Sequence, residues 1–158
     1  MNSPHITASA TSTTAPRSKY VIDCAGAWIT VHARSLAAVL TIDGEIDAVN
    51  TEAFHTAVRR YGVLHSPVIV DLTTLDFLGV GGFRSLMTLS QEYQQADLPF
   101  IVVPGAALRL LLRVFTDHDL ITEPSVTQAL KHITEIKRAP RQILLSMART
   151  APHSFGDT

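Results

Sequence analysis

The feature that most constrains the fold is a repeated switch between two hydrophobic periods from residue 37 onward. Short apolar runs at 37–42, 68–70 and 98–103 have the length and composition of buried strands. Each run is followed by a stretch in which apolar residues recur at helical spacing. Strands separated by helices return to one sheet through crossovers, so the pattern predicts an α/β domain with a largely parallel or mixed sheet.

Helical spacing predicts four helices. Asn50 is a candidate N-cap of the first helix, and the fourth begins near Pro124 and Ser125. Leu110 and Val114 lie off the stripe of the third helix, which makes that helix apolar on more than one side. The four stripes are Phe54, Ala57, Val58, Tyr61 and Leu64; Phe83, Leu86, Met87, Ser90 and Tyr93; Leu108, Leu111, Leu112 and Phe115; and Val126, Ala129, Leu130 and Ile133.

Further strands are expected at both ends of this alternating region. Residues 20–24 and 28–33 are rich in aromatic and β-branched residues on either side of a turn at Ala25 and Gly26. The strand that begins at residue 37 is expected to stop at Asp43 and Gly44, a common turn dipeptide. A final short strand is expected at 120–121.

Three segments follow from composition along the chain. Residues 1–17 are rich in Ser, Thr and Pro and are expected to form a disordered tail. Residues 18–136 form the folded domain, and residues 137–158 are a C-terminal extension expected to hold a short helix and then a tail. The chain shows no signal-peptide pattern and no apolar run of the ~18 residues that a membrane span needs, so a soluble cytoplasmic protein is expected.

Charge and cysteine content exclude several classes of function. The net charge is −1, which argues against direct DNA binding and against a polybasic membrane anchor, because both need an excess of Lys and Arg. The one cysteine, Cys24, rules out an intramolecular disulfide and is expected to be a small buried residue. Only 17% of the residues are charged, below the roughly 25% of an average protein, which fits a chain that binds partners.

The glycine cluster Gly79, Val80, Gly81 and Gly82 lies between a strand and a helix, where phosphate-binding loops occur. A dinucleotide fingerprint would need glycine where the chain has Arg84, and the Gly-Lys-Ser/Thr end of a P-loop is absent. What remains is a helix N-terminus whose amides could hold an anion.

The other titratable clusters are interpreted as structural. Asp43, Glu45 and Asp47 fit a strand end and a helix entry, and Asp117-His118-Asp119 fits a solvated loop. The seven histidines show no metal-binding spacing. We therefore expect no metal, no cofactor and no enzymatic activity.

Two sequence blocks resemble the STAS domain, the family of anti-sigma factor antagonists and of the cytosolic domain of sulphate transporters. The first block is Gly44-Glu45-Ile46-Asp47 before a helix, and the second is Asp71-Leu72 with Leu75-Asp76-Phe77-Leu78 before a turn of small residues. The resemblance covers residues 20–135, and the stand-alone bacterial antagonists are the closer analogue. It implies a STAS-like mixed sheet with helices packed mainly on one side.

The resemblance also implies a switch that this chain has lost. In the family the second hydroxyl of an Asp-Ser/Thr-Ser-Gly turn is phosphorylated by an anti-sigma factor with kinase activity, and the added charge prevents binding. The corresponding residues here are Gly79, Val80, Gly81 and Gly82, so Gly81 occupies the phosphoacceptor position and has no side chain to modify. The nearby hydroxyls of Thr73, Thr74 and Ser85 are the alternative acceptors.

Three functional hypotheses remain open from the sequence. The first is an anti-sigma factor antagonist that regulates sigma-factor-dependent transcription without phosphorylation at this turn. The second is a degenerate STAS scaffold that docks with another STAS-domain regulator or forms a homodimer, and the third is a sensor of a nucleotide or another anion. Recognition at the turn is expected to depend on shape and apolar contact. The expected partner-binding residues are Phe77, Leu78, Gly79, Val80, Gly81, Gly82 and Phe83.

Overall fold

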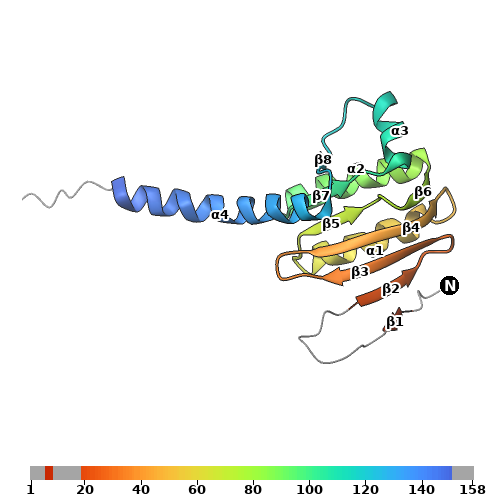
Figure 1. Cartoon of the computed structure of the whole chain (residues 1–158), viewed down its shortest axis with the longest axis horizontal. Coiled ribbons are helices and arrows are strands. Elements are labelled where there is room, and N and C mark those ends of the chain that lie inside the picture. The colour runs from red at the N-terminus through yellow and green to blue at the C-terminus, as the bar shows by residue number, and fades with distance from the viewer. Residues whose placement is uncertain (1–5, 9–18, 151–158) are drawn as a thin grey trace, which may run out of the picture.

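The folded domain begins with an antiparallel meander of three strands. β2 (Lys19–Asp23), β3 (Ala27–Ala33) and β4 (Ala38–Ile46) pair in that order. Along β3, buried residues alternate with partly or fully exposed ones, which is the period of a strand with one face on a core. The structure is a computed structural model that describes residues 6–8 and 19–150 (Figure 1).

The rest of the domain alternates strands and helices as the hydrophobic pattern predicts. Parallel pairing extends the sheet. With the short first strand β1 (Ile6–Ala8), its strand order within the described residues is β1-β2-β3-β4-β5-β7-β8, and β6 pairs with β4 off this path. The predicted mixed α/β fold is confirmed. The further elements are α1 (Thr51–Val63), β5 (Val68–Asp71), β6 (Leu75–Leu78), α2 (Val80–Gln95), β7 (Phe100–Val103), α3 (Ala106–Val114), β8 (Ile121–Thr122) and α4 (Val126–Thr150).

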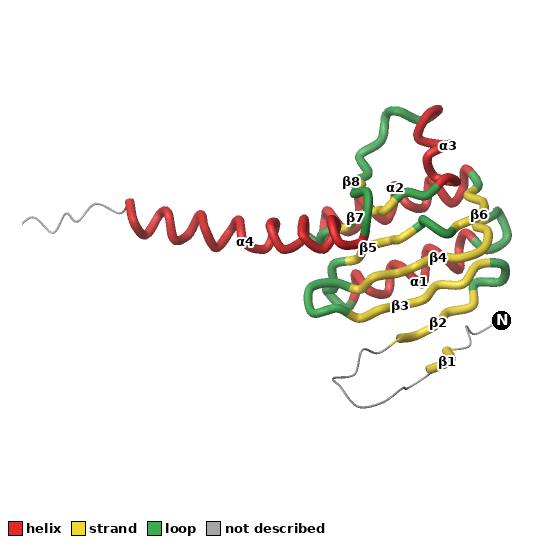
Figure 2. Tube along the Cα trace, in the orientation of Figure 1, coloured by secondary structure: helices red, strands yellow, loops and turns green. Residues whose placement is uncertain are grey.

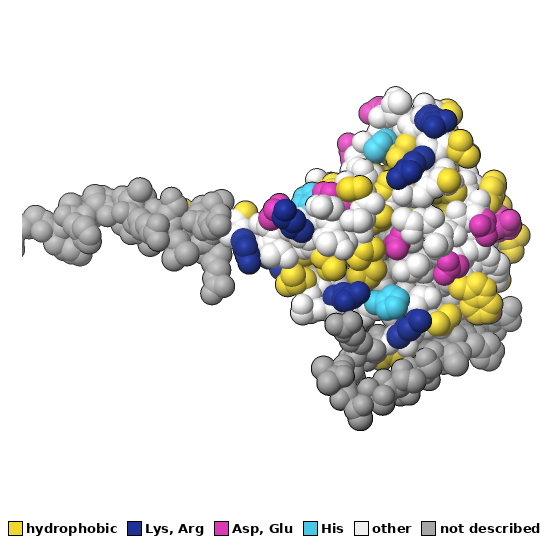
Figure 3. Space-filling model, viewed as in Figure 1, with side chains coloured by type: hydrophobic (Ala, Val, Ile, Leu, Met, Phe, Trp, Pro, Cys, Tyr) yellow, Lys and Arg dark blue, Asp and Glu magenta, His cyan; other side chains and the backbone are white. Residues whose placement is uncertain are grey.

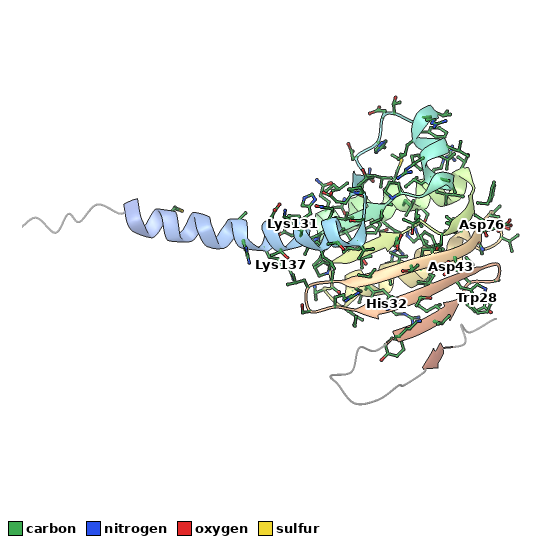
Figure 4. The ribbon with its side chains drawn as sticks, viewed as in Figure 1. Trp28, His32, Asp43, Asp76, Lys131 and Lys137 are labelled. Carbon is green, nitrogen blue, oxygen red and sulfur yellow. The ribbon has the colours of Figure 1, made fainter. Side chains whose placement is uncertain are left out.

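Helices cover the two faces of the sheet unequally (Figures 1 and 2). α1, α2 and the inner side of α3 enclose the larger core, which includes Phe54, Leu86 and Leu108. On the opposite face the start of α4 buries Ala129 and Ile133 over β4, β5 and β7. The β2 and β3 part of that second face has no helix over it in Figure 1. This uncovered part is the side on which Trp28 and His32 lie (Figure 4).

The predicted end of the third strand at Asp43 and Gly44 is wrong. β4 continues to Ile46, with an irregularity in register between Gly44 and Glu45. Gly44 has φ +92, and a Cβ there would lie 2.4 Å from the Gly26 carbonyl oxygen, so the glycine serves a bulge inside the strand and not a turn. At this bulge β4 changes its parallel partner from β5 to β6.

The terminal segments also differ from the sequence-based expectation. Within the predicted disordered tail, Ile6–Ala8 forms the short strand β1, which pairs with the otherwise free edge of β2; the rest of that tail lies outside the described residues. α4 crosses residue 137 without a break and continues to Thr150, so the predicted extension contributes to one long helix. In the described part of the chain, no helix has both the length and the apolar character needed to cross a membrane.

Candidate functional site

The candidate site is the turn between β6 and α2, at the end of the sheet where the parallel strands finish. The Gly79 amide donates a hydrogen bond of 2.8 Å to the Ile46 carbonyl, which ties the turn to the end of β4. Gly79 is the N-cap of α2 and has no side chain to bond the free amides of the first helical turn. The turn is therefore fixed by backbone and packing, and its first helical amides have no side-chain cap.

The glycines of this turn are not equivalent. A Cβ on Gly82 would lie 2.6 Å from Leu78 Cδ1 and 2.8 Å from Ile46 Cγ2, so only glycine fits there without movement of the core. A Cβ on Gly81 would meet its nearest atom, Thr51 Oγ1, at 3.7 Å, and one on Gly79 would be 3.5 Å from the Ile46 carbonyl oxygen. Packing thus requires the glycine that closes the motif and leaves room for a serine at position 81.

The expected partner-binding residues divide between surface and core. Phe77 is 49% exposed and Val80 is 44% exposed, whereas Leu78 and Phe83 are buried. The Phe83 ring stacks on Phe115 with centroids 5.3 Å apart. Direct contact with a partner therefore does not fit Leu78 or Phe83, because their side chains complete the core under the turn. The side-chain surface available at the turn consists of Phe77 and Val80.

The entry to α1 lies against this turn and adds a residue that the sequence did not single out. Thr51 is the nearest neighbour of the Gly81 position, and Val49 before it is 83% exposed. Val49 follows Asp47, whose Oδ1 accepts the Val49 amide at 2.9 Å. We define the apolar patch as Val49, Phe77 and Val80. The signal that could have found Val49 is a lone valine inside a turn, which is too common to single out.

Asn50 holds the α1 entry in place from inside the fold. It is the N-cap position as predicted, but its side chain makes no capping bond to the helix. Its Oδ1 accepts the Asp47 amide at 2.9 Å, and its Nδ2 donates to the Glu45 carbonyl at 2.7 Å and to the Ala25 carbonyl at 3.3 Å. Asn50 is 1% exposed, and it links the end of β4, the entry to α1 and the turn between β2 and β3 beneath the site.

The alternative phosphoacceptors have different surroundings. Thr73 and Thr74 are exposed; Thr73 Oγ1 donates to Asp71 Oδ1 at 2.7 Å. Ser85 is 6% exposed, and its hydroxyl bonds His55 Nδ1 at 2.7 Å across the α1–α2 interface. Of the three hydroxyls, those of the two threonines are the ones a modifying enzyme could reach in this structure.

The His55–Ser85 contact is part of a polar cluster that also includes Arg59 and Glu92. His55 Nε2 lies 3.7 Å from Glu92 Oε1, and Arg59 Nε donates to Glu92 Oε2 at 3.0 Å. The bond from Arg59, followed by the nearby charges of Arg59 and His55, lowers the pKa of Glu92 against the opposing effect of burial. Because the Ser85 hydroxyl is buried, the cluster has the geometry of a clamp between two helices and not that of an exposed nucleophile.

Other chemistry is not assembled in the described part of the chain. No group of three His, Cys, Asp or Glu side chains there is placed to hold a metal ion. Burial, and then the charge of Asp23, raises the pKa of the Cys24 thiol to about 11, so Cys24 is a protonated core residue at neutral pH. Asp47, one of the three clustered carboxylates, is engaged in the α1 entry.

Several carboxylates lie at the end of the sheet that holds the turn (Figure 4). Register pairs Asp23 with Trp28 and Trp28 with Asp43 across β2, β3 and β4, and it pairs Glu45 with Phe77 across β4 and β6. We call the set Asp23, Trp28, Asp43, Glu45, Asp76 and Phe77 the acidic end; Figure 4 labels three of its members, and Figure 3 shows acidic and hydrophobic side chains together there. The low charge of the turn itself therefore does not extend to its surroundings.

The chain is similar to known proteins in both sequence and fold. A family model described as the STAS domain matches residues 29–129. Osmosensory protein A of Mycobacterium tuberculosis is 33% identical over 100 residues, which are 63% of this chain and 63% of that protein. The chain thus matches less than two thirds of the length of this relative.

Solved structures show the same fold. An anti-sigma factor antagonist from Mycobacterium paratuberculosis aligns with a TM-score of 0.59 and 25% identity, over 68% of this chain and 94% of that one. The anti-sigma factor antagonist SpoIIAA in its unphosphorylated form aligns with a TM-score of 0.53 and 13% identity, over 69% of this chain and 97% of that one. At this identity the second likeness concerns the fold alone.

Proposed function

This chain belongs to the STAS domain family, and from that premise we propose that it is a non-enzymatic, cytoplasmic bacterial interaction module that binds an anti-sigma factor. Residues 18–136 are the proposed binding domain. The observation that carries the proposal is the exposure of Phe77 and Val80 at a turn whose closing glycine, Gly82, is required by packing. The turn thus presents an apolar surface on a backbone that close packing holds in place.

The proposed binding is not switched by phosphorylation at the turn. Gly81 stands in the phosphoacceptor position, and the four residues from 79 to 82 contain no hydroxyl. Because no phosphate can be added there, the charge that would disrupt an apolar contact has no point of attachment. Control by another input, or constitutive binding, follows from this proposal.

A binding experiment with candidate kinase-type anti-sigma factors tests the proposal. We expect a stable complex by size-exclusion chromatography and calorimetry whose Kd is the same with and without ATP, and an unchanged intact mass after ATP addition. Replacing Phe77→Ala and Val80→Asp together should weaken the complex by at least about tenfold, since buried aromatic contacts dominate interfaces. Leu64→Asp is the matched control, because Leu64 is 67% exposed at the far end of α1.

The outcomes separate the possibilities. Equal weakening by the double variant and by Leu64→Asp would place the contact elsewhere, and no complex with any candidate would reject the proposed partner class. Gly81→Ser has room for its side chain beside Thr51. In an active complex this variant is expected to gain about 80 Da and to lose binding on ATP addition, which is the signature of a restored switch.

A second candidate function is docking with another STAS-domain regulator. It is favoured by Leu110 and Val114 on α3, which are 62% and 73% exposed as their off-stripe positions predict. Leu110→Asp with Val114→Asp should abolish binding to a sister STAS protein and leave the anti-sigma factor complex intact. Loss of both complexes would mean that α3 and the turn form one surface.

A further inference from the structure

Trp28 lies on the face of the sheet that no helix covers at β2 and β3 (Figures 1 and 4). Its neighbours on β3, Ala27 and Ile29, are buried in the larger core, so the alternation of the strand places Trp28 on the opposite face. The start of α4 buries the β4, β5 and β7 part of that face, and Trp28 remains 51% exposed beside it. A large aromatic side chain is therefore half free on an uncovered sheet surface.

Two carboxylates flank Trp28 on the neighbouring strands. Asp23 of β2 and Asp43 of β4 are its register partners in the two antiparallel pairs. Residues directly opposite each other share a face of the sheet, with Cβ atoms about 4.5–5.5 Å apart, so the three side chains form one row. We call Asp23, Trp28 and Asp43 the Trp28 row. Asp23 Oδ1 accepts the Ala25 amide at 2.9 Å, which holds this carboxylate in place beside Trp28.

The negative charge of the Trp28 row is not balanced by a nearby base. Among the side chains that the structure describes, the ion pairs involve other carboxylates, and neither Asp23 nor Asp43 has a basic nitrogen at ion-pair distance. Basic residues gather instead at the other end of β2 and β3, where Lys19 is the register partner of His32. After the effect of burial, the charges of Lys19 and Arg34 lower the pKa of His32. The Trp28 row is therefore the part of the open face that attracts a cation.

We propose that the Trp28 row receives an arginine side chain of a protein partner. A guanidinium group is planar and always charged, and it stacks well on aromatic rings. Placed on the indole of Trp28, it has a carboxylate on either side to accept its N–H groups. The row thus combines an apolar stacking surface with complementary charge, and the partner that fits it presents an exposed arginine.

The Trp28 row is continuous with the apolar patch of the proposed function. Glu45 follows Asp43 by two residues along β4 and pairs with Phe77 of β6. One partner surface that contacts Phe77 therefore extends readily to the row. The identity of the partner as an anti-sigma factor rests on the proposed function. On that premise, recognition joins an apolar contact at the turn to a charged contact on the open sheet face.

Titration of the purified full chain with blocked peptides tests the row without any partner protein. Trp28 is the one tryptophan of the chain, so its fluorescence reports contact at the row. A tri-arginine peptide should change this fluorescence saturably, and a tri-citrulline peptide, which has nearly the same shape without the charge, should not. Raising NaCl from about 0.05 M to about 0.5 M should weaken binding of the arginine peptide by about tenfold or more, because exposed charges are screened. No saturable change in low salt, or an equal response to both peptides, overturns the inference.

Neutralising variants locate the peptide on the Trp28 row. Asp23→Asn with Asp43→Asn removes the charge and keeps the shape, and asparagine retains an oxygen that accepts the Ala25 amide. This row variant should bind the arginine peptide at least about tenfold more weakly. The matched control is Asp97→Asn with Asp119→Asn, which removes two exposed carboxylates that line a groove by α2 and β8 and should leave binding unchanged. Equal weakening in the two variants would show a general effect of charge and overturn the inference.

The anti-sigma factor complex separates this inference from the proposed function. Where a complex forms, calorimetry should show that Trp28→Leu and the row variant each weaken it by about tenfold or more. A complex that depends on Phe77 and Val80 but is unchanged by these variants keeps the proposed function and overturns the inference. If no anti-sigma factor binds, the proposed function fails, and the peptide titration alone decides the inference.

Other occupants of the Trp28 row give distinct results. A fluorescence response to MgCl2 alone, with none to the arginine peptide, would assign the row to a metal ion. Sedimentation in which the mass of the wild type rises with concentration, while the row variant stays monomeric, would assign it to a second copy of the chain. Either result overturns the proposal.

Discussion

The pair of adjacent glycines at the start of α2 gives the sharpest prediction about stability. In Gly82→Ala the new methyl group would lie 2.6 Å from Leu78 Cδ1 and 2.8 Å from Ile46 Cγ2, whereas carbon atoms in good contact are about 3.5–4.0 Å apart. Leu78 can rotate its terminal methyl aside, but Cγ2 of Ile46 belongs to a stiff β-branched side chain that is fully buried. Such overpacking costs about 1–3 kcal/mol.

Gly81→Ala is the control for this prediction. Its methyl group would meet Thr51 at 3.7 Å, an ordinary contact, and both substitutions gain the same intrinsic helix preference of up to about 1 kcal/mol. The difference between the two variants therefore isolates the steric effect at about 1–3 kcal/mol, with Gly82→Ala the less stable. The free energy of unfolding of a small protein falls by about 2 kcal/mol per M urea. The two variants should therefore differ in their urea midpoints by about 1 M.

Equilibrium urea unfolding of the full chain, followed by circular dichroism, measures the effect. Trp28 is the one tryptophan of the chain and gives a second, independent signal. Midpoints for Gly81→Ala and Gly82→Ala that agree within about 0.2 M, with equal slopes, would refute the argument that close packing fixes the closing glycine.

Three further predictions concern Asn50, Cys24 and His32. Asn50→Ala should lower the free energy of unfolding by about 1–3 kcal/mol in the same urea assay, because it leaves the partly buried Asp47 amide and Glu45 carbonyl without their bonds to Asn50. An unchanged midpoint would contradict this. Cys24 should resist thiol reagents at pH 8 until the chain unfolds, since the thiol is buried and its pKa is about 11. Prompt labelling of the native protein would show that the turn between β2 and β3 opens. Lowering the pH below the usual pKa of histidine near 6.5 should destabilise the fold, because the lowered pKa of His32 makes the unfolded chain bind the proton first. His32→Gln should reduce this slope, and an identical slope in wild type and variant would rule out His32 as its source.

The alternating hydrophobic periods predicted most of the fold because each period reports directly which side of an element is buried. The parallel strands 68–70 and 98–103 were found within two residues, since strands buried on both faces read as continuous apolar runs. β6 was missed because it has four residues and two of them, Asp76 and Phe77, are exposed, so it shows no period. Gly44 was misread because a glycine that permits a bulge looks the same in sequence as one that ends a strand.

The candidate site was located from sequence, but its composition was not. The position of the turn follows from the small residues between a strand and a helical stripe. Which residues face outward depends on how α2 is rotated about its own axis as it packs on the sheet. In the structure this rotation places the Phe83 ring against Phe115 and not at the surface. Of the acidic end, the sequence showed only Asp43 and Glu45, which are neighbours along the chain. Asp23 and Asp76 belong to other strands and join them only through the pairing of β2, β3, β4 and β6.

The change of partner along β4 has a consequence for the order in which the chain folds. β2, β3 and the whole of β4 are joined by tight turns, so their pairing closes only short loops, whereas β4 reaches β5 only after α1 has been placed between them. We therefore expect the meander to form first and to serve as the template on which both parallel partners are added. β6 pairs with β4 only beyond the bulge at Gly44. A substitution that prevents this bulge would therefore leave the meander intact but would detach β6 and the start of α2 from the sheet.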